Sequence, residues 1–378
     1  MTIPSRVAAF GMLVAAVLGA GCAGRARRPE PTPTGRPTLQ REQVVALLDE
    51  ARMARAKGDL PSATGSARRA LAGARGGSSS DLAADAHFLL GEIFGQEGLP
   101  RQSAEAFAQA YDWSRRANDR ARGVRALNAL ANVLLDIGDY DRAFEASSQA
   151  LRLARSTGDL RAQSTALNNV GETHRFGGRY AAAMDSYKQA LPLAQRAGTF
   201  QDVLVILENM ASTARRQGQL EEAAERYDEA LTLARRSGTP EQVANLLNAL
   251  TGVRLIQQRS ADAWLLAREA VDLSRCENLK RPLPRATQNE GLAAWAMGDR
   301  ETAERLLTES AQLAEEMDER QILAYSQWHL GRLALESGDR DGALAALDQA
   351  LKIFRALRLA EETRRVETEL RAAKGDQP

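Results

Sequence analysis

The feature that most constrains this chain is a glycine that returns at intervals of forty residues or a multiple of forty. It stands at Gly58, Gly98, Gly138, Gly178, Gly218, Gly298 and Gly338. Alanine keeps the same spacing five residues after most of these glycines, as at Ala143, Ala183 and Ala223. Self-similarity at a fixed period is typical of arrays in which each unit buries its apolar face against its neighbours. We therefore expect a stack of repeats, with function on its surfaces.

Charge and composition narrow the function classes. The chain has 378 residues, 26% of them charged, and a net charge of +1, so it carries no overall field that would attract nucleic acid. The two cysteines, Cys22 and Cys276, make neither a disulfide framework nor a metal-binding spacing. No short motif of a hydrolase, a nucleotide-binding protein or a metalloprotease stands in a suitable context. The sequence predicts no enzyme, no cofactor, no metal and no small-molecule substrate.

The N-terminus predicts export. An apolar stretch at residues 7–20 is as long as the core of a signal peptide and too short to span a bilayer comfortably. It ends in Leu18-Gly19-Ala20-Gly21-Cys22, which resembles a bacterial lipobox and implies lipidation of Cys22. The match is imperfect, because Gly19 holds the place where the family usually has leucine. The alternatives are ordinary cleavage near Ala20 or Ala23, or an uncleaved anchor.

The segment that follows is rich in arginine and proline. Such a composition favours an extended, poorly ordered tether. We therefore predict a signal peptide at residues 1–21 and a disordered tether at 22–40. The several acyl chains of a mature lipoprotein would hold the protein firmly at a membrane. Ala23 is not the aspartate that retains many lipoproteins in the inner membrane, which favours the outer membrane, facing the periplasm.

The repeat itself resembles a known family. Within residues 166–190, large, small, turn and aromatic residues stand at Leu167, Gly171, Gly178, Tyr180, Ala183, Tyr187 and Ala190. This pattern resembles the helix-turn-helix signature of the tetratricopeptide repeat, and the same phase runs from about Gln43 to about Arg358. The resemblance implies an all-α fold, a right-handed α-solenoid of about eight repeats plus a C-terminal capping helix. The array is expected at residues 41–358, and the capping helix and tail at 359–378.

Two departures from the family pattern bear on the shape of the array. The period is forty residues instead of the usual thirty-four, which extends mainly the second helix and its connection. Repeat 6 has Gln258 in place of the turn glycine, and Pro282 with Pro284 interrupts the connection into repeat 7. If the array has a hinge, we expect it there.

The resemblance also implies where a partner binds, because the first helix of each tetratricopeptide unit lines a concave groove. The groove stripe includes Thr165, Phe176, Asp136, Glu208 and Gln288. The candidates for partner binding are Asn128, Asn132, Asn168, Asn169, Glu172, Arg175, Asn209, Arg215, Arg216, Asn245, Asn248, Asn289, Trp295, Tyr325 and Trp328.

Each group of candidates has two interpretations. Asparagine is disfavoured inside helices, so its recurrence suggests a ladder that holds peptide backbone, as in O-linked N-acetylglucosamine transferase; alternatively the asparagines bond neighbouring helices or water. Arg175, Arg215 and Arg216 could clamp a carboxylate, or Glu172 and Glu208 could neutralise them. The three aromatic residues of repeats 7 and 8 could anchor a partner, or Trp328 could pack beneath the cap.

These observations favour a non-catalytic interaction scaffold, an envelope lipoprotein that binds an extended peptide or partner protein and assists assembly of an envelope complex. Its partners would be a protein or peptide and, through the N-terminal lipid, a membrane. The alternative is a cytoplasmic tetratricopeptide regulator or peptide sensor, which requires the N-terminal apolar stretch to be something other than an export signal.

Overall fold

The computed structural model describes residues 39–76 and 79–375, and these form seventeen α-helices without a strand. The predicted signal peptide, the lipidation site Cys22 and nearly all of the predicted tether lie outside the described residues. Within the described part, no helix is both long enough and apolar enough to cross a membrane.

Sixteen of the helices form eight consecutive antiparallel pairs. The first helices of the pairs are α1 (Arg41–Ala56), α3 (Ser80–Gln96), α5 (Arg120–Asp136), α7 (Leu160–Phe176), α9 (Phe200–Arg216), α11 (Pro240–Ile256), α13 (Leu283–Ala296) and α15 (Arg320–Ser337). The second helices are α2 (Leu60–Gly76), α4 (Pro100–Arg116), α6 (Tyr140–Thr157), α8 (Tyr180–Ala197), α10 (Leu220–Ser237), α12 (Ser260–Cys276), α14 (Arg300–Glu316) and α16 (Arg340–Ala356). The last helix, α17 (Ala360–Lys374), has no partner of its own.

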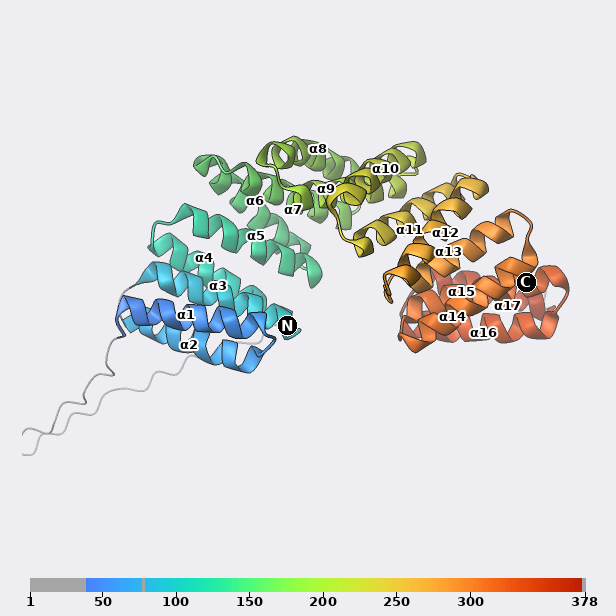
Figure 1. Cartoon of the computed structure of the whole chain (residues 1–378), viewed down its shortest axis with the longest axis horizontal. Coiled ribbons are helices and arrows are strands. Elements are labelled where there is room, and N and C mark those ends of the chain that lie inside the picture. Colours follow the sequence, from blue (N-terminus) through green and yellow to red (C-terminus); the bar gives the residue numbers. More distant parts are fainter. Residues whose placement is uncertain (1–38, 77–78, 376–378) are drawn as a thin grey trace, which may run out of the picture.

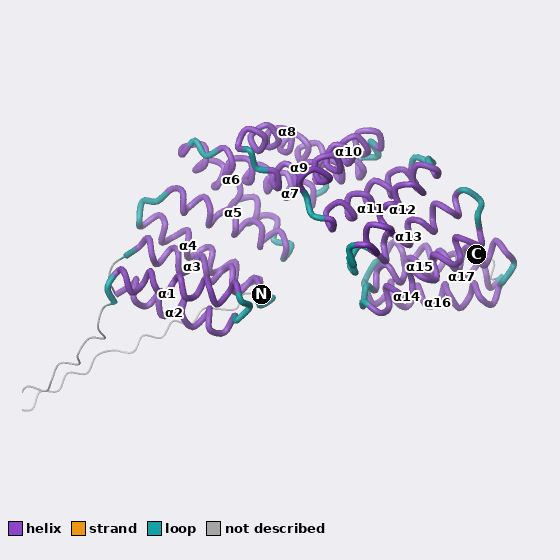
Figure 2. The backbone as a smooth tube through the Cα atoms, viewed as in Figure 1, coloured by secondary structure: helices purple, strands orange, loops and turns teal. Residues whose placement is uncertain are grey.

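The pairs stack into a curved array, which confirms the predicted all-α solenoid. Figure 1 shows an arch that runs from α1 and α2 at one end, over α7 to α10 at its crest, to α14–α17 at the other. The backbone trace shows helices joined by short loops throughout (Figure 2). Helix α17 packs on α16 and buries Val366 and Leu370 in the same core as Phe354, so it covers the end of the array as predicted.

The turn inside each repeat requires a left-handed backbone residue. Gly178 has φ of 72°, a conformation that glycine adopts without steric cost. Gln258, which replaces the glycine in repeat 6, has φ of 59° and takes the same conformation. The missing glycine therefore leaves the fold of that turn unchanged.

The first helix approaches its partner closely where the sequence has a small residue. A side chain at Gly171 would collide with the ring of Tyr187, which is completely buried. The hydroxyl of Tyr187 donates to Glu172 Oε1 at 2.7 Å. Burial, followed by the adjacent Glu172 carboxylate, raises the pKa of Tyr187 above its ordinary value. The small residue thus fixes the place of a buried aromatic side chain directly behind the groove.

The junction with the sparsest helix packing lies between repeats 5 and 6, one repeat earlier than the expected hinge. Most connections between repeats contain a left-handed residue, as at Asn278 (φ 52°), but Gly238 is extended, with φ of −90° and ψ of 179°. Helices α9 and α11 make almost no direct contact, whereas α11 and α13 pack against each other beside the prolines at 282 and 284. The two prolines begin α13, and the sparsest packing between first helices lies one repeat before the predicted hinge.

Candidate functional site

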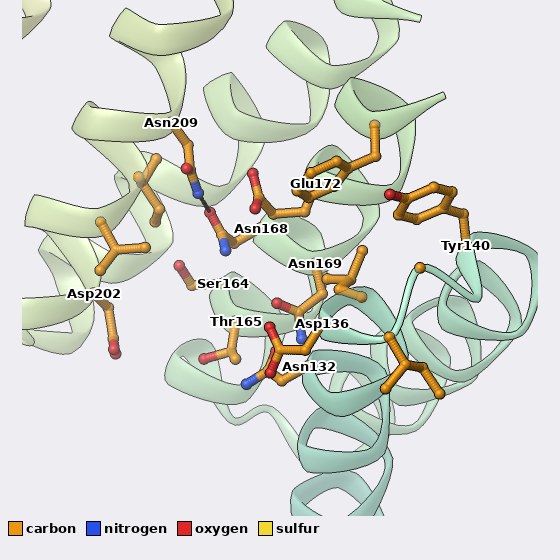
Figure 3. A pocket seen from close by; sticks show the side chains of 16 residues that line it. Asn132, Asp136, Tyr140, Ser164, Thr165, Asn168, Asn169, Glu172, Asp202 and Asn209 are labelled. Carbon is orange, nitrogen blue, oxygen red and sulfur yellow. Dashed lines mark hydrogen bonds between the residues drawn. The ribbon is translucent and has the colours of Figure 1, made fainter. Parts of the chain in front are cut away.

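A pocket of about 870 Å³ opens between α5, α7 and α9, the first helices of repeats 3, 4 and 5. Thr165 and Asn168 come from α7, Asn132 and Asp136 from α5, and Asp202 from α9 (Figure 3). All three are first helices, which the sequence predicted to line the groove. The predicted groove therefore contains a defined pocket in its central section.

Two carboxamides bridge α7 and α9 across this pocket. Asn209 Nδ2 donates a hydrogen bond of 3.0 Å to Asn168 Oδ1 (Figure 3). Both side chains are half-buried, and neither Asn168 Nδ2 nor Asn209 Oδ1 bonds to another residue within the described chain. The pair consequently offers one donor and one acceptor to a ligand, the combination that a peptide backbone complements.

One edge of the pocket is aromatic. The rings of Tyr140 and Phe176 stack with centroids 5.2 Å apart and an interplanar angle of 8°. The two residues are 36% and 46% exposed, and Ile137 beside them is 37% exposed. Arg175 Cζ lies 4.3 Å from the Phe176 ring centroid, a cation-π distance. This edge is therefore a partly exposed aromatic surface, on which Arg175 covers part of the Phe176 ring.

The charged side chains that line the pocket are all acidic: Asp136, Glu172 and Asp202. Glu172 is neutralised by Arg175, whose Nε and Nη2 donate at 2.9 and 3.0 Å. Asp202 accepts from Arg161 Nε at 2.9 Å. Asp136 is exposed and has no ion pair or hydrogen bond from its carboxylate among the described residues. The pocket therefore favours a cationic ligand group.

A second hollow, of about 720 Å³, continues this groove toward the N-terminal end and shares Thr165 with the first. Its lining is of mixed charge. Asp85 accepts from Arg122 at 2.9 and 3.0 Å and from Arg125 at 3.2 Å. Because these charges satisfy one another, this section offers a ligand fewer open polar groups than the pocket beside it.

Several predicted groove asparagines are buried instead of open to the groove. Asn128 and Asn169 are 8% and 3% exposed. Asn128 Nδ2 donates to the Ala162 carbonyl and Asn169 Nδ2 to the Asn128 carbonyl, each at 3.4 Å. These bonds join α5 to α7, so the two carboxamides hold neighbouring helices together, and Asn169 also lines the pocket.

The same arrangement recurs later in the array. Asn248 Nδ2 donates to the Pro282 carbonyl at 3.2 Å, and Asn289 Nδ2 donates to the Asn248 carbonyl at 3.2 Å. Gln288 Nε2 donates to the Ile322 carbonyl at 3.2 Å. All three residues are buried, at 8%, 6% and 2% exposure. Of the predicted asparagines, Asn132, Asn168, Asn209 and Asn245 remain accessible, and Asn245 lies apart from the pocket on α11.

The predicted arginine cluster does not form one patch. The side chain of Arg175 is only 14% exposed and is committed to Glu172. Arg215 and Arg216 are exposed in the last turn of α9, which places them outside the pocket lining. The interpretation that an acidic neighbour neutralises the cluster therefore holds for Arg175.

Two of the three C-terminal aromatic residues contact the cap, and the third bonds the neighbouring helix α15. Trp328 is 8% exposed, and its Nε1 donates to Glu369 of α17 at 2.7 Å. The Tyr325 hydroxyl donates to Glu362 at 2.8 Å, and burial together with that carboxylate raises the pKa of Tyr325 to about 12. Trp295 Nε1 donates to Glu336 at 3.1 Å. Trp328 thus packs beneath the cap, as the alternative interpretation had it.

Some of the site was not recognised from the sequence. Tyr140 occupies the position of the family's signature aromatic, which gives no indication that its ring stacks on Phe176 outside the core. Asp136 was placed on the groove stripe, but its lack of an internal partner follows only from the packing around it. A search for metal-binding groups of histidine, cysteine and acidic residues finds none in the described chain.

The comparisons agree with this architecture. Residues 124–196 and 202–275 match the tetratricopeptide repeat family, and residues 268–337 and 289–357 match anaphase-promoting complex subunit 5. A search of curated proteins found no match.

Similar solved structures include the apo form of RapI, with a TM-score of 0.66 at 12% identity, covering 84% of this chain and 87% of that one. A signal-transduction ATPase with a tetratricopeptide repeat sensor, from Pyrococcus horikoshii, has a TM-score of 0.65 at 15% identity, and the match covers 85% of this chain and 48% of the ATPase. A Rap protein complexed with competence and sporulation factor has a TM-score of 0.54 at 14% identity, covering 88% and 98%. These likenesses show the tetratricopeptide-type solenoid fold.

Proposed function

We propose that this chain is a non-catalytic scaffold that binds an extended segment of a partner protein in the pocket between α5, α7 and α9. The observation that carries the proposal is the pair Asn168 and Asn209. Its members bond to each other at 3.0 Å and leave one amide donor and one carbonyl acceptor facing a pocket of about 870 Å³.

Comparison within the chain supports a ligand role for this pair. Asparagine inside a helix carries a cost in helix propensity, which a bond to a neighbouring helix can offset. Asn169 and Asn289 make such bonds to backbone carbonyls of the preceding repeat. Asn168 and Asn209 make only a bond to each other, so their remaining hydrogen-bonding capacity is free for a peptide.

The buried serine hydroxyl of the pocket lining supports binding over catalysis. Ser164 lines the pocket but is completely buried, and its Oγ donates to the Ala190 carbonyl at 3.0 Å. A nucleophilic serine needs a base within hydrogen-bonding distance, and here a carbonyl occupies that position. Ser164 accordingly has a structural role.

The groove is tested by crosslinking capture from native membranes, with the intact chain compared with the Asn168→Ala/Asn209→Ala variant. The account expects a partner that the intact chain captures and the double variant does not. Gln312→Ala is the control, since Gln312 is exposed on α14, far along the array from the pocket. Equal capture by the intact chain and the double variant would move the working surface elsewhere.

We also propose that the scaffold works in the cell envelope, exported and anchored by a lipid on Cys22, with the outer membrane favoured. The support is the sequence that precedes the array, an apolar stretch that ends at a cysteine. Metabolic palmitate labelling tests it, with label expected on the natural chain and absent from Cys22→Ala. Label that persists in the variant, or its absence from both chains, would contradict lipidation at this cysteine.

A cytoplasmic peptide sensor is the second candidate. It is favoured by the likeness to a Rap protein whose structure holds competence and sporulation factor. Both candidates use the same groove, so binding assays cannot distinguish them. Cell fractionation can, because the two candidates differ in location. Recovery in the membrane fraction supports the envelope scaffold, whereas recovery in the cytoplasmic fraction supports the sensor.

A further inference from the structure

We infer that the pocket between α5, α7 and α9 selects a peptide that places a lysine or arginine within two positions of a large apolar side chain. This inference rests on the proposed function and specifies the chemistry of its ligand. The cationic group lies against Asp136, and the apolar side chain lies against Tyr140 and Phe176.

The cation preference follows from the pocket's uncompensated charge. Asp136 is the last residue of α5, where the exposed carbonyl end of a helix carries partial negative charge. A carboxylate there is destabilised by the helix itself, and no described side chain neutralises it, in contrast to Glu172 and Asp202. A ligand cation beside Asp136 would pair with its carboxylate and would also interact favourably with the carbonyl end of α5. The absence of any basic residue from the lining leaves that position to the ligand.

The apolar preference follows from the stacked rings. Tyr140 begins α6 and Phe176 ends α7, so the pair spans two repeats at the edge of the pocket. Their exposed fractions of 36% and 46% are large for aromatic rings that already contact each other. Exposed aromatic rings beside a pocket are typical anchors at protein interfaces. An apolar side chain placed on them removes more aromatic surface from water without any rearrangement of the array.

Asp136 and Tyr140 lie at the two ends of the short turn that joins α5 to α6, on the same side of the carboxamide pair, so one extended segment can pass both subsites. Figure 3 shows Asp136 and Asn132 projecting from α5, Asn168 and Asn209 meeting across the α7–α9 boundary, and Tyr140 at the pocket's edge. In an extended peptide, side chains two positions apart point the same way, and backbone amides between them remain free. The peptide can therefore bond Asn168 and Asn209 through its backbone while its side chains reach Asp136 and the rings.

The test is a peptide array in a glycine-serine background, in which two central positions, adjacent or separated by one residue, carry every pair of amino acids. It is probed with the natural chain and with Asp136→Asn and Phe176→Ala. Asp112→Asn and Leu265→Ala are matched controls, since both residues are exposed on second helices away from the pocket. Circular dichroism checks that each variant keeps its helices.

The expected result is enrichment of pairs that combine a basic with a large apolar residue. Asp136→Asn should weaken binding of a selected peptide about fivefold and abolish the preference for the basic residue, because one exposed ion pair is lost. Phe176→Ala should weaken it about tenfold or more and abolish the apolar preference. The controls should bind as the natural chain does, and added salt should reduce binding through Asp136 alone.

Two results would overturn the inference, and they differ in what they leave standing. Peptides selected without a basic or apolar preference, but lost with Asn168→Ala/Asn209→Ala, would refute the ligand chemistry and keep the proposed function. No peptide selected by the natural chain would contradict both.

Discussion

The middle of the array and its C-terminal end both carry aromatic pairs but place them in different surroundings. In the middle, Tyr140 and Phe176 stack at the surface of an open pocket. At the end, Trp328 stacks on His329 at 5.9 Å and is covered by α17, with its Nε1 bonded to Glu369. An aromatic residue at these places is therefore exposed beside the pocket or buried in the core according to whether another helix covers it.

The carboxamides show the same contrast. Positions forty residues apart form a column whose members are Asn128, Asn168, Glu208, Asn248, Gln288 and Trp328. Gln288 near the end is 2% exposed and bonds α15, whereas Asn168 in the middle is half-buried and lines the pocket. The same column therefore joins neighbouring helices at Gln288 and lines the pocket at Asn168.

The largest expected effect is on stability at the end of the array. Trp328→Ala should cost about 3–5 kcal/mol, because it empties a core position beneath the cap. Phe176→Ala, on an exposed ring, should cost less than about 1 kcal/mol. Since long arrays can unfold in parts, hydrogen exchange resolved by helix is the suitable measurement. Equal loss of protection in the two variants would remove the contrast between the regions.

Low pH should destabilise the C-terminal end of the array. Burial, followed by Arg332 and Arg285, lowers the pKa of His329 to about 4 from 6.5. A histidine with a lowered folded pKa stabilises the fold fully above pH 6.5, and this stability is lost as pH falls toward 4. The loss amounts to at most about 3 kcal/mol. Exchange in α15–α17 should accelerate over this range, and His329→Gln should suppress the acceleration; an unchanged acid response in the variant would refute the assignment.

A pair of asparagine variants should separate scaffold from ligand roles. Asn289→Ala leaves the buried Asn248 Oδ1 without its donor and removes the bond to the Asn248 carbonyl, which should cost about 1–3 kcal/mol. Asn209→Ala removes a bond between half-buried side chains, so its cost should stay below about 1 kcal/mol while peptide binding falls. Unfolding and peptide titration on both variants test this. If Asn209→Ala lost more stability and Asn289→Ala lost more peptide affinity, the ligand role of Asn209 would be refuted.

The smallest expected effect is a gain in stability at the junction between α9 and α11. Glu208 occupies the column position at which Asn248 and Gln288 donate to carbonyls, and an ionised carboxylate cannot donate. Burial raises the pKa of Glu208 above 4.5. Stability tied to its protonated form is therefore lost as pH rises from 4.5 through that raised value.

Glu208→Gln should stabilise the array at neutral pH by about 0.5–1 kcal/mol, by removing the buried charge and supplying a donor. The gain should vanish below pH 4.5, where the natural side chain is neutral. Thermal unfolding of both chains at pH 4 and pH 7 measures it. A gain of equal size at both pH values would show that charge at this position is irrelevant.

Periodicity predicted the fold because glycine and alanine at fixed places report the turn and the close approach inside each repeat. Those contacts are local to a helix pair, as at Gly171 against Tyr187. The burial of the groove asparagines could not be predicted the same way, because it depends on the distance between first helices of successive repeats. Thr239, which precedes Pro240, is extended with ψ of 155°, as the steric effect of proline requires. That dipeptide was the overlooked signal for the junction between repeats 5 and 6.

The central claim, that a peptide occupies the pocket between α5, α7 and α9, is tested most directly by site-specific photocrosslinking. A benzophenone side chain is introduced at Thr165, which lines the pocket, or, as the matched control, at Asp112 on α4. The probe is a peptide selected on the array. We expect a crosslink from position 165 that unlabelled peptide competes away, and none from position 112. A crosslink from position 112 with none from position 165 would contradict it.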